Sequence, residues 1–127
     1  MSKLILIVDD EPMIRYLLQY LLSMDGFQVS EACDGMEALG KVEQQRPDLV
    51  LLDYMMPNMD GLATCKQLRS RPETANLPII MLSANAMPSI IEASVQAGVN
   101  RFLDKSGNIS HTLTEHIYDV LGNQLLH

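Results

Sequence analysis

The chain has no tryptophan, only two phenylalanines and two cysteines, and few basic residues. Nine lysines and arginines stand against sixteen aspartates and glutamates, which leaves a formal net charge of −7. A nucleic-acid-binding domain needs a basic face, so we expect no direct binding to DNA or RNA. No apolar run approaches the roughly 20 residues of a membrane span, and no basic-then-apolar leader opens the chain. We therefore expect a cytoplasmic protein without membrane contact.

The two cysteines, Cys33 and Cys65, lack the close spacing of a metal pair, and we expect buried free thiols rather than a disulfide. With 127 residues the chain has the size of one domain that can bury a core. Its 47% hydrophobic and 20% charged residues are ordinary for a globular protein. No linker, repeat or low-complexity segment divides it, so residues 1–127 are predicted to form a single domain.

Short apolar runs alternate with helical patterns along the whole chain. Most of these runs are continuous and too short for helices, which is typical of strands covered on both faces. Proline, glycine and aspartate at their ends favour turns and helix starts. The expected strands are residues 3–8, 27–32, 49–53, 78–83 and 99–104. The expected helices are about 12–24, 35–46, 62–71, 90–97 and 109–121, with a polar loop at 73–77.

Five strands that alternate with five helices predict an α/β fold with a doubly wound parallel sheet and right-handed crossovers. Of the two common strand orders, the five-stranded, flavodoxin-like order 2-1-3-4-5 fits the number of elements. The first and third strands are neighbours in that order. Their carboxyl ends form the switch point at which such sheets bind ligands.

Three carboxylates follow the first and third strands: Asp9 and Asp10 come after residues 3–8, and Asp53 ends residues 49–53. Uncompensated carboxylates at one edge repel one another, so a cation is expected there. Mg²⁺ suits this cluster better than zinc, because no His or Cys accompanies it. Alternatively, Asp9 or Asp10 caps the first helix. Capping by one of them leaves the second carboxylate and Asp53 unexplained.

Ser83 and Lys105 stand at the carboxyl ends of the fourth and fifth expected strands. The fold brings both towards the same crevice. An ammonium can pair with Asp53 or with a phosphoryl group on it, and a hydroxyl can bond to a phosphoryl oxygen. Each residue alone is more simply a solvated surface side chain. Together with the carboxylates they predict a site.

These residues, in this order and at these spacings, resemble the receiver domain of two-component response regulators. The resemblance covers about residues 3–121. It rests on Asp9-Asp10, on Pro47-Asp-Leu-Val-Leu-Leu-Asp53 with Met56-Pro57 and Asp60-Gly61, and on Ser83-Ala84, Phe102 and Lys105. It implies a phosphorylation-activated signalling domain, not an enzyme, that catalyses only its own phosphotransfer and slow self-dephosphorylation.

The resemblance also implies roles for single residues. Asp53 would be the nucleophile that accepts a phosphoryl group. Asp10 and Asp53 would bind Mg²⁺ together with the backbone carbonyl of Met55, while Asp9 would reach the metal mainly through water. The remaining roles concern the phosphoryl group and the switch: Ser83 would bond to it, Lys105 would pair with it, and Phe102 would change rotamer as Ser83 moves.

The partners that the resemblance implies are a sensor histidine kinase or phosphotransfer protein and a downstream protein target. We expect the target to bind the face made by the fourth helix, fifth strand and fifth helix, residues 87–121. We expect a monomer or a phosphorylation-dependent dimer. A stand-alone receiver of the chemotaxis or sporulation type is our first interpretation, and a receiver excised from a longer regulator is the alternative.

Two other functions are weaker. A Mg²⁺-dependent hydrolase with an Asp nucleophile would carry a second Asp at position 55, where this chain has Met55. A degenerate receiver that only binds partners would not need the acidic residues and Lys105. His111 and His116, on the last expected helix, are predicted to be surface or half-buried residues rather than ligands.

The chain departs from the family after Lys105, where Ser106 replaces the usual proline of a cis peptide bond. A cis bond before a non-proline residue costs roughly 2.5–4 kcal/mol. We therefore predict a trans Lys105–Ser106 bond, with Lys105 still directed at Asp53 and Gly107 taking up the turn. The resemblance implies that Met55 and Asn85 would flank the path of an attacking water, and at these two positions the family does not fix the lifetime of the phosphorylated state.

Overall fold

The structure, a computed structural model, describes residues 2–106 and 109–125. The strands are β1 (Leu4–Val8), β2 (Gln28–Ala32), β3 (Leu49–Asp53), β4 (Ile79–Ser83) and β5 (Arg101–Asp104). The α-helices are α1 (Pro12–Met24), α2 (Gly35–Gln44), α3 (Gly61–Arg69), α4 (Pro88–Ala97) and α5 (Ile109–Leu125). A short 3-10 turn, η1 (Pro72–Thr74), overlaps the start of the stretch predicted as a loop, residues 73–77. None of the helices described has the length and apolarity needed to cross a membrane.

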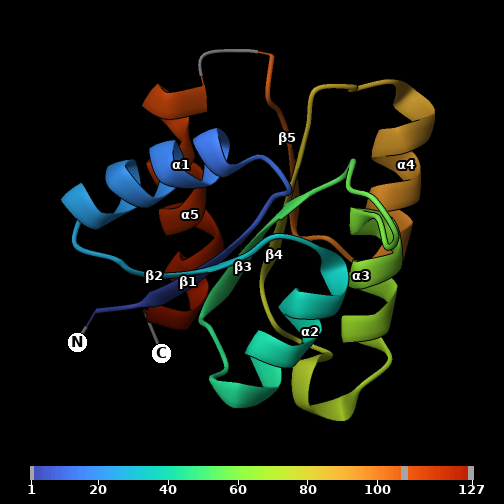
Figure 1. The fold of residues 1–127 in the computed structure, drawn as a ribbon, viewed down its shortest axis with the longest axis horizontal. Helices are drawn as coiled ribbons and strands as arrows, with labels where there is room; N and C mark the ends of the chain where they lie inside the picture. Colours follow the sequence, from blue (N-terminus) through green and yellow to red (C-terminus); the bar gives the residue numbers. More distant parts are fainter. Residues whose placement is uncertain (1, 107–108, 126–127) are drawn as a thin grey trace.

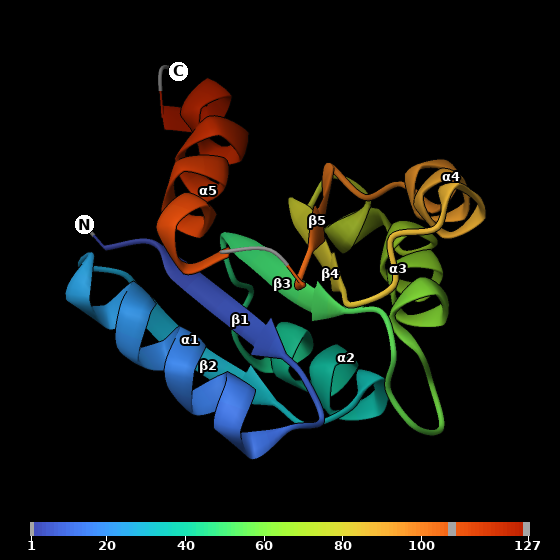
Figure 2. The same ribbon diagram turned by 90° about the horizontal axis from the view of Figure 1, so that it is seen from above.

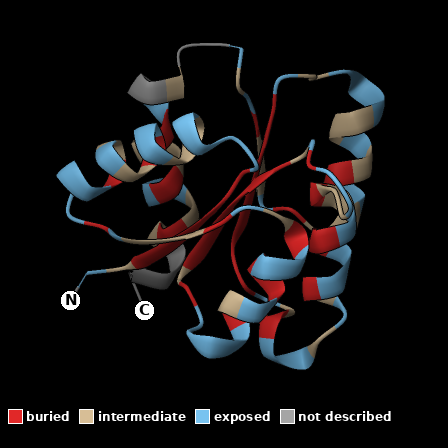
Figure 3. Cartoon of the chain, in the orientation of Figure 1, coloured by how far each residue is buried: buried red, intermediate tan, exposed pale blue. Residues whose placement is uncertain are grey.

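The five strands form one parallel sheet in the order β2-β1-β3-β4-β5, which confirms the predicted fold (Figure 1). Helices α1 and α5 cover one face, and α2, α3 and α4 cover the other (Figure 2). Strands β1, β3 and β4 are short runs, almost entirely apolar, that are buried on both faces, whereas the edge strands β2 and β5 are only partly buried (Figure 3). Strands buried on both faces need helices on both sides, and this requirement explains the three layers.

Successive residues of a strand face opposite sides of the sheet, and this alternation assigns the core residues to two clusters. In β3, Leu49 and Leu51 pack on the α1 and α5 side, whereas Val50 and Leu52 pack on the side of α2 and α3. Asp53 follows in the same alternation as Leu49 and Leu51. The carboxylate is therefore placed where the α1 side of the sheet opens at its carboxyl edge.

Local signals set the helix boundaries. Asp34 and Asp60 cap α2 and α3 by accepting the backbone N–H groups of Glu37 and Ala63. Gly98 ends α4 with a left-handed φ of 106°, a conformation that glycine adopts readily at the end of a helix.

One prediction about the cysteines is wrong. Cys65 is a buried free thiol, but Cys33 is exposed, because it follows β2 in the turn towards α2.

Candidate functional site: an acidic pocket at the carboxyl edge of the sheet

The parallel pairing of β1 with β3 brings two carboxylates together. Val8 is opposite Leu52 in the sheet, so the next residues, Asp9 and Asp53, lie side by side at the carboxyl edge. Both residues are almost fully buried, with Asp9 1% exposed and Asp53 4% exposed. Two buried carboxylates need compensation, because burial and mutual repulsion both oppose their charge.

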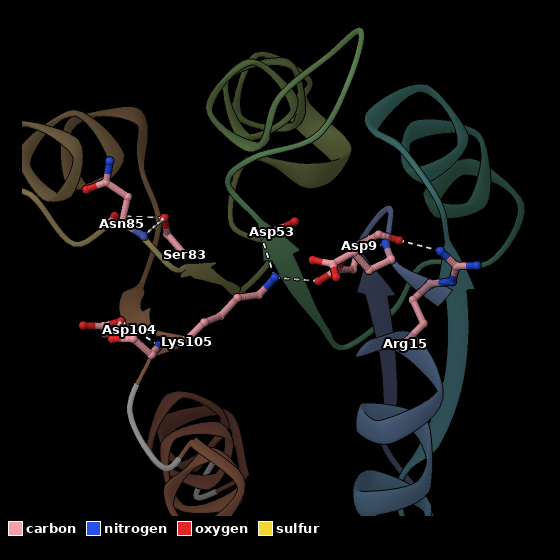
Figure 4. Close-up of polar contacts among 9 residues, drawn as sticks. Asp9, Arg15, Asp53, Ser83, Asn85, Asp104 and Lys105 are labelled. Carbon is pink, nitrogen blue, oxygen red and sulfur yellow. Dashed lines mark hydrogen bonds and ion pairs between the residues drawn. The ribbon is translucent and has the colours of Figure 1, made fainter. Parts of the chain in front are cut away.

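Lys105 supplies a compensating positive charge, and it comes from the end of the edge strand β5. Its Nζ lies 2.8 Å from Oδ2 of Asp9 and 3.0 Å from Oδ1 of Asp53 (Figure 4). Lys105 directly follows β5, so its side chain passes the end of β4 to reach β3 and β1. The structure thus unites Lys105 with the carboxylates, across 96 residues of sequence in the case of Asp9.

Asp10 adds a third carboxylate, and this one is exposed. One ligand oxygen from each of Asp9, Asp10 and Asp53 can be chosen so that all lie within 4.8 Å of one another. A single ammonium leaves this group with excess negative charge. An open hollow of about 390 Å³ borders it, lined by Asp10, Tyr54, Met55, Met56, Pro57 and Asp60.

The donors of this cluster fit a hard divalent cation. All three side chains offer carboxylate oxygen, and the cluster that the described residues form contains neither His nor Cys. Oxygen ligands on one open side, with room for water, match the coordination of Mg²⁺ rather than that of zinc. Met55, whose backbone carbonyl was predicted as a further ligand, is exposed at the rim of the same hollow.

Burial and the charge of Asp9 raise the pKa of Asp53 from its ordinary value near 3.8 to about 6, although Lys105 pulls it down. Keeping Asp53 ionised in the folded protein therefore costs free energy when no cation other than Lys105 is present. Burial alone would lower the pKa of Lys105, but its hydrogen bond to Asp9 and the charge of Asp53 outweigh burial and raise it. The ammonium is accordingly charged at neutral pH.

Asp9 also organises the start of α1. Its Oδ1 accepts the backbone N–H of Glu11 at 2.9 Å, and its carbonyl accepts a bond of 2.6 Å from Arg15. The capping position itself belongs to Glu11, whose side chain makes no capping bond. The alternative that Asp9 or Asp10 caps α1 is therefore wrong in its strict form. Asp9 satisfies one N–H just before the helix and pairs with Lys105 as well.

Ser83 ends β4 next to Asp53, but its hydroxyl is engaged elsewhere. Its Oγ accepts the N–H of Asn85 at 3.0 Å and donates to the carbonyl of Asn85 at 2.9 Å. Ser83 continues the alternation of Ile79 and Met81, which pack with α3, whereas Asp53 follows the other face. Figure 4 shows Ser83 directed to Asn85 and Lys105 directed to Asp53. Phe102 in β5 is half-buried against the core on the α3 side.

The loop after β5 matches one prediction. The peptide bonds within the described residues include no cis bond, so Lys105–Ser106 is trans, as predicted. The part predicted for Gly107 lies outside the described residues.

Two residues that hold the backbone around the site were not predicted from the sequence. Arg15 holds the carbonyl of Asp9, and Asp104 accepts two bonds from Ser106. An Asp two residues before a Ser is a turn signal that could have pointed to Asp104.

The histidines stay apart from the acidic cluster as far as the structure describes them. His116 is half-buried in α5, and its Nδ1 lies 3.0 Å from a guanidinium nitrogen of Arg101. The side chain of His111 lies outside the described part of the chain.

The raised pKa of Asp53 predicts how stability depends on pH. The folded protein holds a proton on Asp53 more tightly than the unfolded chain, so this contribution is present below the ordinary pKa and is lost as pH rises from 3.8 to about 6. Asp53→Asn stays neutral. Without divalent cations it should be more stable than wild type above about pH 6 by roughly 1–3 kcal/mol, with the difference vanishing in acid.

Urea unfolding in EDTA across this pH range measures the difference. Asp119→Asn, which removes an exposed carboxylate of α5, is the control and should show no such pH-dependent gain. Equal stability of wild type and Asp53→Asn at neutral pH would contradict the charge repulsion inferred for the pocket.

Curated proteins with similar sequences are transcriptional and response regulators. The alkaline phosphatase synthesis transcriptional regulatory protein PhoP of Bacillus subtilis is 51% identical over 84 residues, which are 66% of this chain and 34% of that protein. Response regulator MprA of Mycobacterium bovis is 44% identical over 105 residues, which are 83% of this chain and 45% of that protein. The chain spans less than half the length of these curated relatives.

Solved structures with the same fold cover nearly the whole chain. Chemotaxis protein CheY4 of Vibrio cholerae superposes with a TM-score of 0.90 at 31% identity, over 95% of this chain and 100% of that one. The receiver domain of sensor histidine kinase PA1611 from Pseudomonas aeruginosa, solved with a magnesium ion coordinated in its active site cleft, gives 0.87 at 30% identity, over 96% and 99%. The family model of the response regulator receiver domain matches residues 5–117. The chain therefore belongs to the response regulator receiver domains of two-component signalling.

Proposed function

We propose that Asp53 accepts a phosphoryl group from a phosphohistidine of a sensor histidine kinase or phosphotransfer protein in a Mg²⁺-dependent reaction. The observation that carries this proposal is the burial of Asp53 between a second carboxylate, Asp9, and the ammonium of Lys105. Structural packing alone does not require an arrangement this costly. A nucleophile that must meet a charge-rich phosphoryl group benefits from it.

In the proposed transfer a carboxylate oxygen of Asp53 attacks phosphorus while the bond from phosphorus to the histidine nitrogen breaks. Lys105 already lies 3.0 Å from Oδ1 of Asp53, so its ammonium can pair with an oxygen of the transferred group. Asp10 and Asp53, with Asp9 and the carbonyl of Met55, would hold Mg²⁺. When bound, the ion supplies positive charge that lowers the repulsion between the carboxylates and the incoming phosphoryl oxygens.

We place the switch in Ser83 and Phe102. The Ser83 hydroxyl bonds to the backbone of Asn85, and Asn85 Oδ1 in turn accepts the N–H of Met87, directly before α4. If Ser83 turned to a phosphoryl oxygen, both of its bonds to Asn85 would be lost and the segment before α4 would have to rearrange. Phe102 would then change rotamer next to it. A ligand shifts such an equilibrium only by its differential affinity for the two states.

The face made by α4, β5 and α5 is proposed as the surface for the downstream protein. Helix α4 has one buried residue, Ser94, while Val95 within it and Met87 directly before it are exposed apolar residues. A helix with so little burial can shift at low cost. We propose that the protein is a monomer or a phosphorylation-dependent dimer.

We further propose that residues 1–127 act as one stand-alone, cytoplasmic receiver domain without contact to nucleic acid or membrane. All described elements belong to a single fold, and CheY4 is covered along its full length. A receiver joined to an output domain is the alternative suggested by the longer curated relatives. A hydrolase finds no support, because position 55 is Met55 and the family is that of signalling domains.

Incubation with acetyl phosphate and Mg²⁺ tests the acceptor. Intact mass should rise by one phosphoryl group in wild type and in the control Asp119→Asn, and should not rise in Asp53→Asn, because an amide cannot act as the nucleophile. Modification of Asp53→Asn to the wild-type extent would place the acceptor elsewhere.

Beryllofluoride, which mimics a phosphoryl group on a carboxylate, tests the output surface. Amide chemical shifts should change in residues 87–106 and 109–121 as well as around Asp53. The variant Ser83→Ala keeps the pocket but lacks the hydroxyl, so changes on α4 should shrink while those at Asp53 persist. Changes confined to the pocket in wild type would count against this surface.

A further inference from the structure

The side chain of Lys105 must extend across the edge of the sheet to reach its partners. Lys105 lies on the loop after the edge strand β5, while its partners Asp9 and Asp53 belong to the loop after β1 and to β3. The side chain passes the end of β4 and places Nζ within 3.0 Å of both carboxylates. A long side chain magnifies small rotations of its own backbone. The position of the ammonium therefore depends on what holds the backbone on either side of Lys105.

On the strand side, the sheet holds this backbone. The N–H of Lys105 donates to the carbonyl of Ser83 at 2.8 Å, the last sheet-like bond between β4 and β5. Ser83 and Asp104 are paired residues in the same register. The strand ends there, so the following peptide needs another anchor.

On the loop side, Asp104 provides this anchor. Its Oδ1 accepts the backbone N–H of Ser106 at 2.8 Å and the hydroxyl of Ser106 at 2.6 Å. These two bonds lower the pKa of the exposed Asp104 carboxyl. The bonds close a short ring whose middle residue is Lys105.

We propose that Asp104 and Ser106 are positioning residues that aim the ammonium of Lys105 at Asp9 and Asp53. They do so by a side-chain clamp around a trans peptide bond. Asp104 acts as a hydrogen-bond acceptor and not as a charge, because the ammonium of Lys105 pairs with Asp9 and Asp53 instead of its neighbour. The proposal deepens the function proposed for the pocket. Of its two readouts, only the rate of phosphorylation rests on that proposed function.

The proposed role predicts different results for variants that keep the clamp, variants that remove part or all of it, and a control variant elsewhere. Asp104→Asn keeps an acceptor oxygen and removes the charge, whereas Asp104→Ala removes both. Ser106→Thr keeps the hydroxyl, whereas Ser106→Ala keeps only the backbone N–H bond. Glu115→Ala, an exposed residue of α5, is the control for loss of one negative charge. Thermal melts verify that each variant is folded.

The first readout is the ammonium itself, in the protein without metal or phosphoryl donor. Nitrogen-15 spectra of lysine NH₃⁺ groups should show a distinct, slowly exchanging Lys105 signal in wild type, Asp104→Asn, Ser106→Thr and Glu115→Ala. The signal should broaden or disappear in Asp104→Ala and weaken in Ser106→Ala. Because no phosphoryl transfer is involved, this readout stands or falls independently of the function proposed for Asp53.

The second readout is the rate of phosphorylation by acetyl phosphate with Mg²⁺. A displaced ammonium should slow Asp104→Ala by about tenfold, Ser106→Ala should be intermediate, and Asp104→Asn should stay within about twofold of wild type. A wild-type Lys105 signal in Asp104→Ala would overturn the proposal. Equal loss of the signal in Asp104→Asn and Asp104→Ala would overturn the acceptor role. If Asp104→Ala does not fold, an unchanged signal in Ser106→Ala would overturn the role of the hydroxyl clamp.

Discussion

Electrostatic compensation at the carboxyl edge of the sheet is the constraint on which the site depends. Asp9 and Asp53 are buried side by side, Asp10 stands beside them, and the ammonium of Lys105 bonds to the two buried carboxylates. One positive charge cannot balance three negative ones. The pocket is therefore poised to take up a cation, and a carboxylate held under this repulsion is suited to receive an electrophilic phosphorus.

The fold explains why these four residues meet. The switch between β1 and β3 places Asp9 next to Asp53, because residues at the carboxyl ends of adjacent parallel strands share one edge. Lys105 arrives from β5, with β4 between it and its partners, so the loops after these strands decide its aim. The same loops carry the Ser83–Asn85 and Asp104–Ser106 bonds. Charge at the centre of the pocket and geometry at its rim are thus coupled.

The sequence predicted the sheet order and the acidic cluster, because both follow from apolar runs and from the residues that end them. It also predicted the trans bond before Ser106 from the cost of a cis one. It did not predict the bonds of Ser83 to Asn85, the clamp by Asp104 or the exposure of Cys33. Those features depend on side chains that bond to nearby backbone and on the path of a turn. Hydrophobic periodicity carries no information about either.

Stabilisation by Mg²⁺ is the most direct test of the compensation that underlies this account. A ligand that binds only the folded state raises the free energy of unfolding by RT ln(1 + [L]/Kd). Urea unfolding near neutral pH should therefore show wild type and the control Asp119→Ala gaining stability as Mg²⁺ rises. Asp10→Ala, which lacks the exposed carboxylate, should gain little or none. An equal gain in Asp10→Ala, or no gain in wild type, would contradict the assignment of this pocket.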